Sequence, residues 1–177
     1  MTPAERKKQE GYRDARITGE YENIWKNVGK CAFCHLNDDY VFHEENGVVL
    51  VVALYAYIDG HAMIIPRRHV KSVKELTPSE WETMRKFMYI AKKLIREIHG
   101  IKGIQIVQKD GAGAQSTVEH LHFHTIPFDA PDLSAWNYRK LKNTPKENVD
   151  LYNSQREKIT KLSKRFAKKY QDEESRA

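Results

Sequence analysis

The feature that most constrains this chain is a short segment, HLHFHTIP, in which histidines occupy the alternate positions 120, 122 and 124. Side chains of a β-strand point alternately to its two faces, so a strand here places the three imidazoles on one face. The intervening side chains then turn toward the core. Because three rings that titrate near neutral pH disfavour one another's protonation, some stay neutral and nucleophilic. This pattern predicts a ligand-binding face; the alternative is a solvated or buried row of histidines without a function.

Apolar runs and turn signals around this segment predict an α+β fold class. A capping signal, Thr77-Pro78-Ser79-Glu80, precedes apolar residues at every third or fourth position up to His99-Gly100. This spacing predicts a helix of about 21 residues that covers one face of a sheet. The turn Ile58-Asp59-Gly60 makes the first two strands antiparallel. The predicted strands are 48–57, 62–65, 103–107 and 121–126.

The C-terminal part of the chain carries the positive charge. Formal net charge is +6, and the excess lies in residues 139–169, whereas residues 1–138 are balanced. The capping signal recurs as Thr144-Pro145-Lys146-Glu147, which predicts a basic amphipathic helix with a gap near position 155. Its predicted apolar side consists of Val149, Tyr152, Ile159, Leu162, Phe166 and Tyr170.

Length and composition favour one core with appendages. In 177 residues we expect an N-terminal extension over 1–30, a central domain over 31–130, and a helical extension with a frayed acidic tail over 131–177. Eighteen consecutive apolar residues occur nowhere, and the first thirty are rich in charge, so neither a membrane span nor a secretory signal is predicted. The only two cysteines have the spacing of a metal or redox pair, which favours a reducing, cytoplasmic setting.

The segment before the histidines is rich in small and polar residues. Gly111 and Gly113 let backbone amides approach an anion, and Ser116 and Thr117 add hydroxyl donors. This composition is compatible with a phosphate-binding loop. An ordinary flexible turn is the alternative.

Three motifs together carry a resemblance to a known family. HLHFHTIP, the glycine-rich loop before it, and the upstream segment from Gly60 to His69 closely resemble the histidine triad (HIT) superfamily from about Cys31 to Pro127. The resemblance implies a HIT-like fold with a five-stranded antiparallel sheet and one long helix, here with an additional C-terminal amphipathic helix. It also implies a homodimer that binds purine nucleotides and cleaves or transfers nucleoside monophosphates. Substrates of the family include nucleoside phosphoramidates, aminoacyl adenylates and dinucleoside polyphosphates.

The same resemblance assigns catalytic roles by position. His122 matches the nucleophile that attacks the α-phosphorus and forms a nucleotidyl-histidine intermediate. His124 matches the partner that contacts phosphate or hydroxyl groups, and His61 matches the upstream histidine that helps to bind phosphate. Thr117 falls where a hydroxyl can assist the leaving group.

Other ligand contacts follow from the resemblance with two departures from the usual pattern. Ser116 stands where Gln is usual, so contacts to the leaving group differ. Lys109 replaces an Asn or Gln that touches phosphate, and a lysine favours a longer polyphosphate; a solvent-facing lysine is the alternative. Asp39, or its neighbour Asp38, is the candidate ribose ligand. The nucleotide-binding set is therefore Lys109, Gly111, Ser116, Val118 and Asp39.

A second constellation suits a metal ion. Two thiolates and two imidazoles match tetrahedral zinc, and relatives with a CxxC resemble this arrangement. With four protein ligands the zinc is structural. Reduced thiols and a redox pair are the alternatives, and His35 is a competing ligand. The predicted ligands are Cys31, Cys34, His69 and His120.

These expectations favour an enzyme, a HIT-type nucleotide hydrolase or nucleotidyltransferase. The alternative class is a non-catalytic nucleotide-binding scaffold that contacts a partner through the basic C-terminal helix. Removal of adenylate from nucleic-acid ends ranks lower, because the sequence contains no zinc finger or aromatic stacking platform beside the basic segment. Nucleic acid and membrane are therefore not expected as partners.

Overall fold

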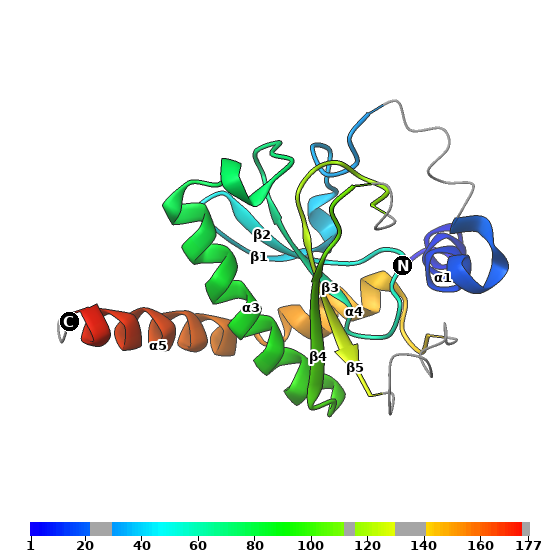
Figure 1. Ribbon diagram of the computed structural model, residues 1–177. Helices are drawn as coiled ribbons and strands as arrows, with labels where there is room; N and C mark the ends of the chain where they lie inside the picture. The colour runs from blue at the N-terminus through cyan, green and yellow to red at the C-terminus, as the bar shows by residue number, and fades with distance from the viewer. Residues whose placement is uncertain (22–29, 112–115, 130–140, 175–177) are drawn as a thin grey trace.

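Five antiparallel strands form one sheet in the order β1-β2-β3-β5-β4 in the computed structural model of the protein (Figure 1). This confirms the predicted α+β fold class with a five-stranded sheet. The structure describes residues 1–21, 30–111, 116–129 and 141–174, with the backbone alone for 166–174. The strands are β1 Val41–Glu45, β2 Val48–Val52, β3 Ala62–Pro66, β4 Gly103–Gln108 and β5 Phe123–Phe128.

Helix α3, Pro78–His99, covers one face of the sheet as the periodicity predicts. It begins at a capping box in which Thr77 and Glu80 bond each other's backbone amides, and it ends at Gly100, whose φ is +69°. Phe87 and Leu94 of the helix are fully buried in one cluster with Leu50 of β2. The long helix is therefore held by an apolar stripe of the expected period.

Strand β2 is buried on both faces, which explains why its sequence is apolar throughout. Val48, Leu50 and Val52 belong to the core beneath α3, whereas Val49 and Val51 belong to a second cluster on the opposite face. That second cluster contains Phe33, Tyr40, Met63, Ile65 and Leu141. The face of the sheet away from α3 is therefore covered too, and the candidate site lies there.

Two predicted strands have different bounds in the structure. The strand expected over 48–57 ends at Val52, because the chain turns away after Ala53 donates to the His61 carbonyl. The strand expected over 121–126 begins only at Phe123, since the Leu121 amide donates to the carbonyl of Val70 outside the sheet. Strand β1 has no counterpart in the residue pattern; as an edge strand with the sequence VFHEE it lacks an apolar run.

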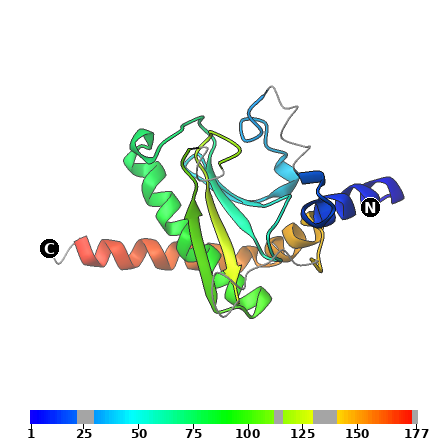
Figure 2. The same ribbon diagram turned by 45° about the vertical axis from the view of Figure 1, so that its right-hand side comes forward.

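The C-terminal segment forms two helices, α4 Pro145–Asn153 and α5 Arg156–Glu174, separated at the predicted gap. Tyr152 stacks on Phe42 of β1, with ring centroids 4.3 Å apart, and its hydroxyl donates to the Gly60 carbonyl. Val149, Ile159 and Leu162 are buried as expected, whereas Phe166 and Tyr170 lie outside the described side chains. Figures 1 and 2 both show α5 extending away from the sheet.

An N-terminal helix, α1 Pro3–Thr18, has no counterpart among the predicted elements. It begins with a capping box of Thr2 and Glu5, and it lies at the opposite end of the molecule from the tip of α5 (Figure 2). Gln9 joins it to the body through the Tyr40 hydroxyl and the Lys146 amide. In the described part of the chain, none of the helices combines the length and apolar character that a bilayer crossing requires.

Candidate active site and metal site

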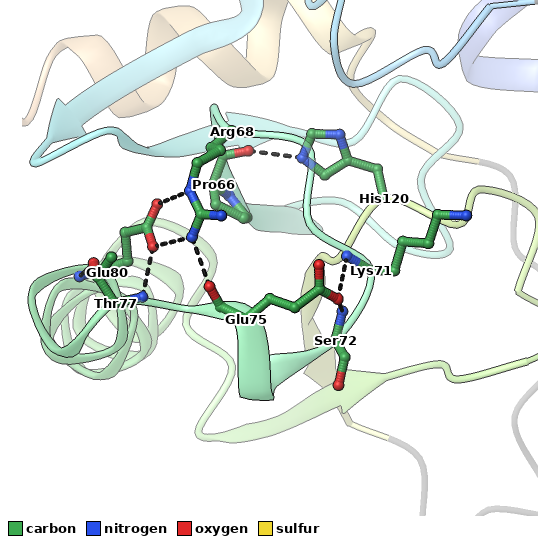
Figure 3. A network of polar contacts seen from close by, with 8 residues as sticks. All are labelled: Pro66, Arg68, Lys71, Ser72, Glu75, Thr77, Glu80 and His120. Carbon is green, nitrogen blue, oxygen red and sulfur yellow. Dashed lines mark hydrogen bonds and ion pairs between the residues drawn. The ribbon is translucent and has the colours of Figure 1, made fainter.

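The segment that follows β3 is fixed by ion pairs and helix caps (Figure 3). The Arg68 guanidinium donates to the Glu80 carboxylate, at 2.8 and 3.2 Å, and to the Glu75 carbonyl at 2.7 Å. Glu80 also accepts from the Thr77 amide at the start of α3, and its bond from Arg68 lowers the pKa of Glu80 to about 2. These contacts hold the Pro66 carbonyl and the segment that carries His69.

The four predicted metal ligands converge on one point. Their donor atoms all lie within 4.8 Å of one another. The separations between Sγ and Nδ1 are 3.1 Å for Cys34 and His69, 3.5 Å for Cys31 and His120, and 3.6 Å for Cys34 and His120. Zinc bonds of about 2.3 Å to sulfur and about 2.0 Å to nitrogen place tetrahedral ligands ~3.5 Å apart. The set therefore fits zinc, and His35 is not part of it.

His120 has the tautomer that a metal ligand needs. Its Nε2 donates to the Pro66 carbonyl at 2.8 Å, and a carbonyl can only accept, so Nε2 carries the proton. The lone pair of His120 then lies on Nδ1, the atom that faces both thiols. Such a hydrogen bond from the second ring nitrogen is typical of metal-ligating histidines.

His122 has the opposite arrangement. Its Nδ1 donates to the backbone carbonyl of His120 at 2.8 Å, so the lone pair of the neutral ring lies on Nε2. The ring lines a cavity and meets Phe33 edge to face, with centroids 4.8 Å apart. His122 therefore presents a nucleophilic nitrogen to the cavity.

His61 and His124 form a hydrogen-bonded pair behind the same cavity. The Tyr57 amide donates to His61 Nδ1 at 3.2 Å, which places the His61 proton on Nε2. His61 Nε2 is 2.9 Å from His124 Nδ1 and donates to it. His124 then carries its proton on Nε2, so it offers an N–H group while His122 offers a lone pair.

Burial keeps these three rings neutral. It is the largest cause lowering the pKa of His122, His61 and His124, and it takes His124 to about 3 and His61 well below its ordinary value. The sequence pattern predicted neutral rings from mutual repulsion, which is only a secondary cause here. At neutral pH each of the three rings is therefore a neutral imidazole, with one N–H group and one nitrogen lone pair.

The rings open onto a cavity of about 470 Å³, within the usual size of a small-molecule site. One wall is apolar and includes Phe33, Leu36, Val51 and Met63. Such a wall suits a planar base, and the histidines that line the same cavity suit a phosphate.

The predicted nucleotide contacts divide into two groups. Lys109, Ser116, Thr117 and Val118 line the cavity beside the triad. Ser116 donates its hydroxyl to the Val118 carbonyl at 3.2 Å. Gly111, with φ of +76°, and Asp39 are not among the described lining residues, and their roles stay predictions. Asp38 pairs with Arg67, and Gly113 lies outside the described residues.

Sequence reasoning missed one group of lining residues. Arg16 of α1, with Tyr21 and Tyr57, lies at the cavity beside His61. The capping signal Thr2-Pro3-Ala4-Glu5 could have revealed the helix, but nothing in the sequence connects Arg16 to a site more than forty positions away.

Comparisons with known proteins agree with this geometry. The family profile of the HIT domain matches residues 35–130. The chain is 32% identical over 94 residues to the bis(5'-nucleosyl)-tetraphosphatase (asymmetrical) of Schizosaccharomyces pombe, covering 53% of this chain and 52% of that protein. It is 33% identical over 81 residues to the AP-4-A phosphorylase of Mycobacterium tuberculosis, covering 45% and 42%. The matches thus span about half of these relatives or less.

Among solved structures, a zinc-bound histidine triad family protein from Mycobacterium smegmatis superposes with a TM-score of 0.62 at 21% identity. The superposition covers 76% of this chain and 96% of that protein, so the two share a fold. Fold, motif order and matched profile agree, and this chain belongs to the HIT domain family.

Proposed function

We propose that this protein cleaves a nucleotide at its α-phosphate, with His122 as the nucleophile. One observation carries the proposal: in a single cavity, His122 presents the lone pair of Nε2 and His124 presents the N–H of Nε2. A lone pair can bond to phosphorus while an N–H donor stabilises a non-bridging phosphoryl oxygen.

In the first step, His122 Nε2 bonds to the α-phosphorus and the bond from phosphorus to the leaving group breaks. The leaving group takes the electron pair of that bond. The positive ring that results keeps its proton on Nδ1 and donates a hydrogen bond to the His120 carbonyl, 2.8 Å away, which stabilises the positive charge. A polyphosphate leaves as an anion, whereas an amine must gain a proton; the Thr117 hydroxyl at the cavity can relay it, donating its own proton to the amine while it accepts one from water.

In the second step, water or inorganic phosphate attacks the nucleotidyl group. The new P–O bond forms as the bond between phosphorus and Nε2 breaks, and His122 recovers its lone pair. When water attacks, it loses a proton to solvent and the product is a nucleoside monophosphate; attack by phosphate gives a nucleoside diphosphate. The two-step route replaces one difficult displacement by two easier ones.

We assign dinucleoside polyphosphates as the leading substrates, with a purine against the apolar wall. The S. pombe tetraphosphatase and the M. tuberculosis phosphorylase, both named for such substrates, support this class. Lys109 at the cavity supports it too, because an ammonium favours a longer phosphate chain. Nucleoside phosphoramidates are the second class.

We also propose that Cys31, Cys34, His69 and His120 hold a structural zinc ion. The fit of their donor atoms and the zinc-bound M. smegmatis protein support this assignment. When bound, the ion fixes the cysteine segment against His120 and takes no part in the chemistry. As in the family resemblance, we expect a homodimer.

A turnover assay tests the proposal. Diadenosine tetraphosphate, diadenosine triphosphate and an adenosine phosphoramidate are offered with and without inorganic phosphate. The wild type and the control variant His43→Asn, altered on β1 away from the cavity, should release adenine nucleotides, and His122→Asn should release none while still binding AMP. If the wild type binds AMP but cleaves no member of the panel, the protein is a nucleotide-binding scaffold and the proposal is wrong.

A further inference from the structure

A stack of four planar groups connects the N-terminal helix to the triad. The Arg16 guanidinium carbon lies 3.9 Å from the ring centroid of Tyr21 and 4.0 Å from that of Tyr57. The Tyr57 ring in turn stacks on His61, with centroids 5.0 Å apart and planes 15° apart. Arg16 Nε also donates to the Tyr55 carbonyl at 2.7 Å. Arg16 is therefore fixed in place, one ring away from His61.

Packing of α1 against the body sets this position. The Gln9 side chain donates to the Tyr40 hydroxyl at 2.7 Å and accepts from the Lys146 amide at 3.1 Å. Tyr12 meets Tyr40 and Tyr55 edge to face, and Ala15 is 1% exposed. The helix is thus anchored along its length, and Arg16 reaches the cavity from a packed element.

Positive charge gathers at the same end of the cavity. Lys109 Nζ donates to the Tyr57 hydroxyl at 3.0 Å, so Tyr57 carries one cation on its face and another at its edge. After burial, the charges of Arg16 and Lys109 contribute to the lowered pKa of His61 and His124. Among the described residues that line the cavity there is no carboxylate.

The neutral triad and these cations suit different parts of one substrate. His122 and His124 serve the phosphate that is attacked, but neutral rings cannot balance the charge of a phosphate chain beyond it. A guanidinium and an ammonium at the adjoining end of the cavity can balance that charge. Charge-assisted hydrogen bonds to phosphate are also among the strongest hydrogen bonds in proteins.

We propose that Arg16 and Lys109 form a subsite for the phosphate groups beyond the attacked one, so that α1 selects polyphosphate substrates over phosphoramidates. This inference rests on the proposed function for its reaction, and it assigns a specificity role to a helix outside the matched HIT region 35–130.

Binding of AMP and ATP to protein carrying His122→Asn, which prevents turnover, tests the subsite by calorimetry. Arg16→Ala should weaken ATP binding about tenfold or more and AMP binding less than about twofold, because only ATP extends beyond the first phosphate. Arg16→Lys should lie between, since it keeps the charge and loses the planar fork. Arg13→Ala, one turn earlier on α1 and paired with Asp14, is the matched control and should change neither affinity.

Salt dependence adds a readout that a purely structural role would not change. ATP affinity of the protein with Arg16 should fall more steeply with KCl concentration than that of Arg16→Ala. Thermal unfolding of each variant checks that α1 stays packed, and Arg16→Lys carries the test if Arg16→Ala does not fold.

Equal losses for AMP and ATP, or no loss for either, would overturn the subsite and leave Arg16 as an anchor of α1. This result is distinct from failure of the proposed function. If the wild type cleaves nothing in the panel but Arg16→Ala still weakens ATP selectively, the subsite stands and the reaction is wrong.

Discussion

Two histidines only two positions apart, His120 and His122, use opposite ring nitrogens. His120 donates a hydrogen bond from Nε2 to the Pro66 carbonyl and directs Nδ1 at the proposed metal site. His122 instead donates from Nδ1 to the His120 carbonyl, which leaves the lone pair of Nε2 facing the cavity. Each ring is buried, and burial is the largest cause lowering the pKa of each. The backbone carbonyl that each ring meets, not the residue type, determines its chemistry.

The comparison also shows how the proposed metal site and the catalytic cavity are joined. The carbonyl that orients His122 belongs to His120, whose side chain lies among the proposed zinc ligands. A bound ion that fixes His120 therefore also fixes the acceptor that sets the tautomer of His122. Loss of either region should affect the reaction, but by different amounts.

Removing the nucleophile should have the largest effect. We expect His122→Asn to lower kcat with diadenosine tetraphosphate by about 10⁴-fold or more, because the ring that forms the proposed covalent intermediate is removed. Steady-state rates measure the loss of kcat, and AMP titration checks that the variant still binds a nucleotide. A His122→Asn protein that retains a tenth of the wild-type kcat would remove His122 from the mechanism.

Removing the N–H donor should have the next largest effect. His124→Ala loses the hydrogen bond to the phosphoryl oxygen, and loss of one such donor costs about 10²- to 10³-fold in kcat. His124→Gln can still donate an N–H, so part of the loss should be restored. Equal rates for the alanine and glutamine variants would show that His124 does not act as a donor.

Removing a metal ligand should cost less. Cys31→Ser should release zinc, lower the melting temperature and reduce kcat about 10- to 100-fold through the orientation of His122. Metal analysis, thermal unfolding and rates are measured on the same preparation. Full activity in protein shown to be free of metal would contradict the link between the two regions.

The last effect concerns stability as a function of pH and leaves the rate of the reaction aside. Burial lowers the pKa of His124 to about 3 from its ordinary value of 6.5, so between these values the unfolded chain binds a proton that the folded chain does not. The free energy of unfolding should therefore fall as pH decreases from 6.5 toward 3, and His124 contributes up to about 1.4 kcal/mol per pH unit.

His124→Asn, which cannot titrate, should show a shallower dependence over the same range in chemical denaturation. The comparison subtracts the contributions of other groups, including those of the metal ligands. Identical slopes for the two proteins would mean that His124 titrates normally in the folded state.

The sequence alone predicts much of the frame. The same capping signal begins three helices at Thr2, Thr77 and Thr144, and the apolar stripes that follow the two later signals predict their helices. The sequence does not predict helix α1, because the helix is mostly polar and only Gln9 and Ala15 of it are buried. A capping signal predicts where a helix starts, but packing against residues distant in the sequence decides whether the helix contributes to the site.

The candidate site also has features that the sequence predicts and features that only the fold reveals. Residue chemistry together with the family resemblance predicted the convergence of the four sulfur and nitrogen donors, and the resemblance alone predicted that Lys109 and Thr117 lie at the site. Spacing could not predict which carbonyl each imidazole meets, nor that Arg16 stacks on Tyr57, because both depend on segments brought together only by the fold.

The nucleotidyl-histidine intermediate tests the central claim most directly. Rapid quench of the wild type with diadenosine tetraphosphate, followed by peptide mass spectrometry and NMR of the modified imidazole, identifies the residue and the ring nitrogen. The tautomer set by the His120 carbonyl predicts AMP bonded to Nε2 of His122. Turnover without any adduct, or an adduct on Nδ1 or on another residue, would contradict it.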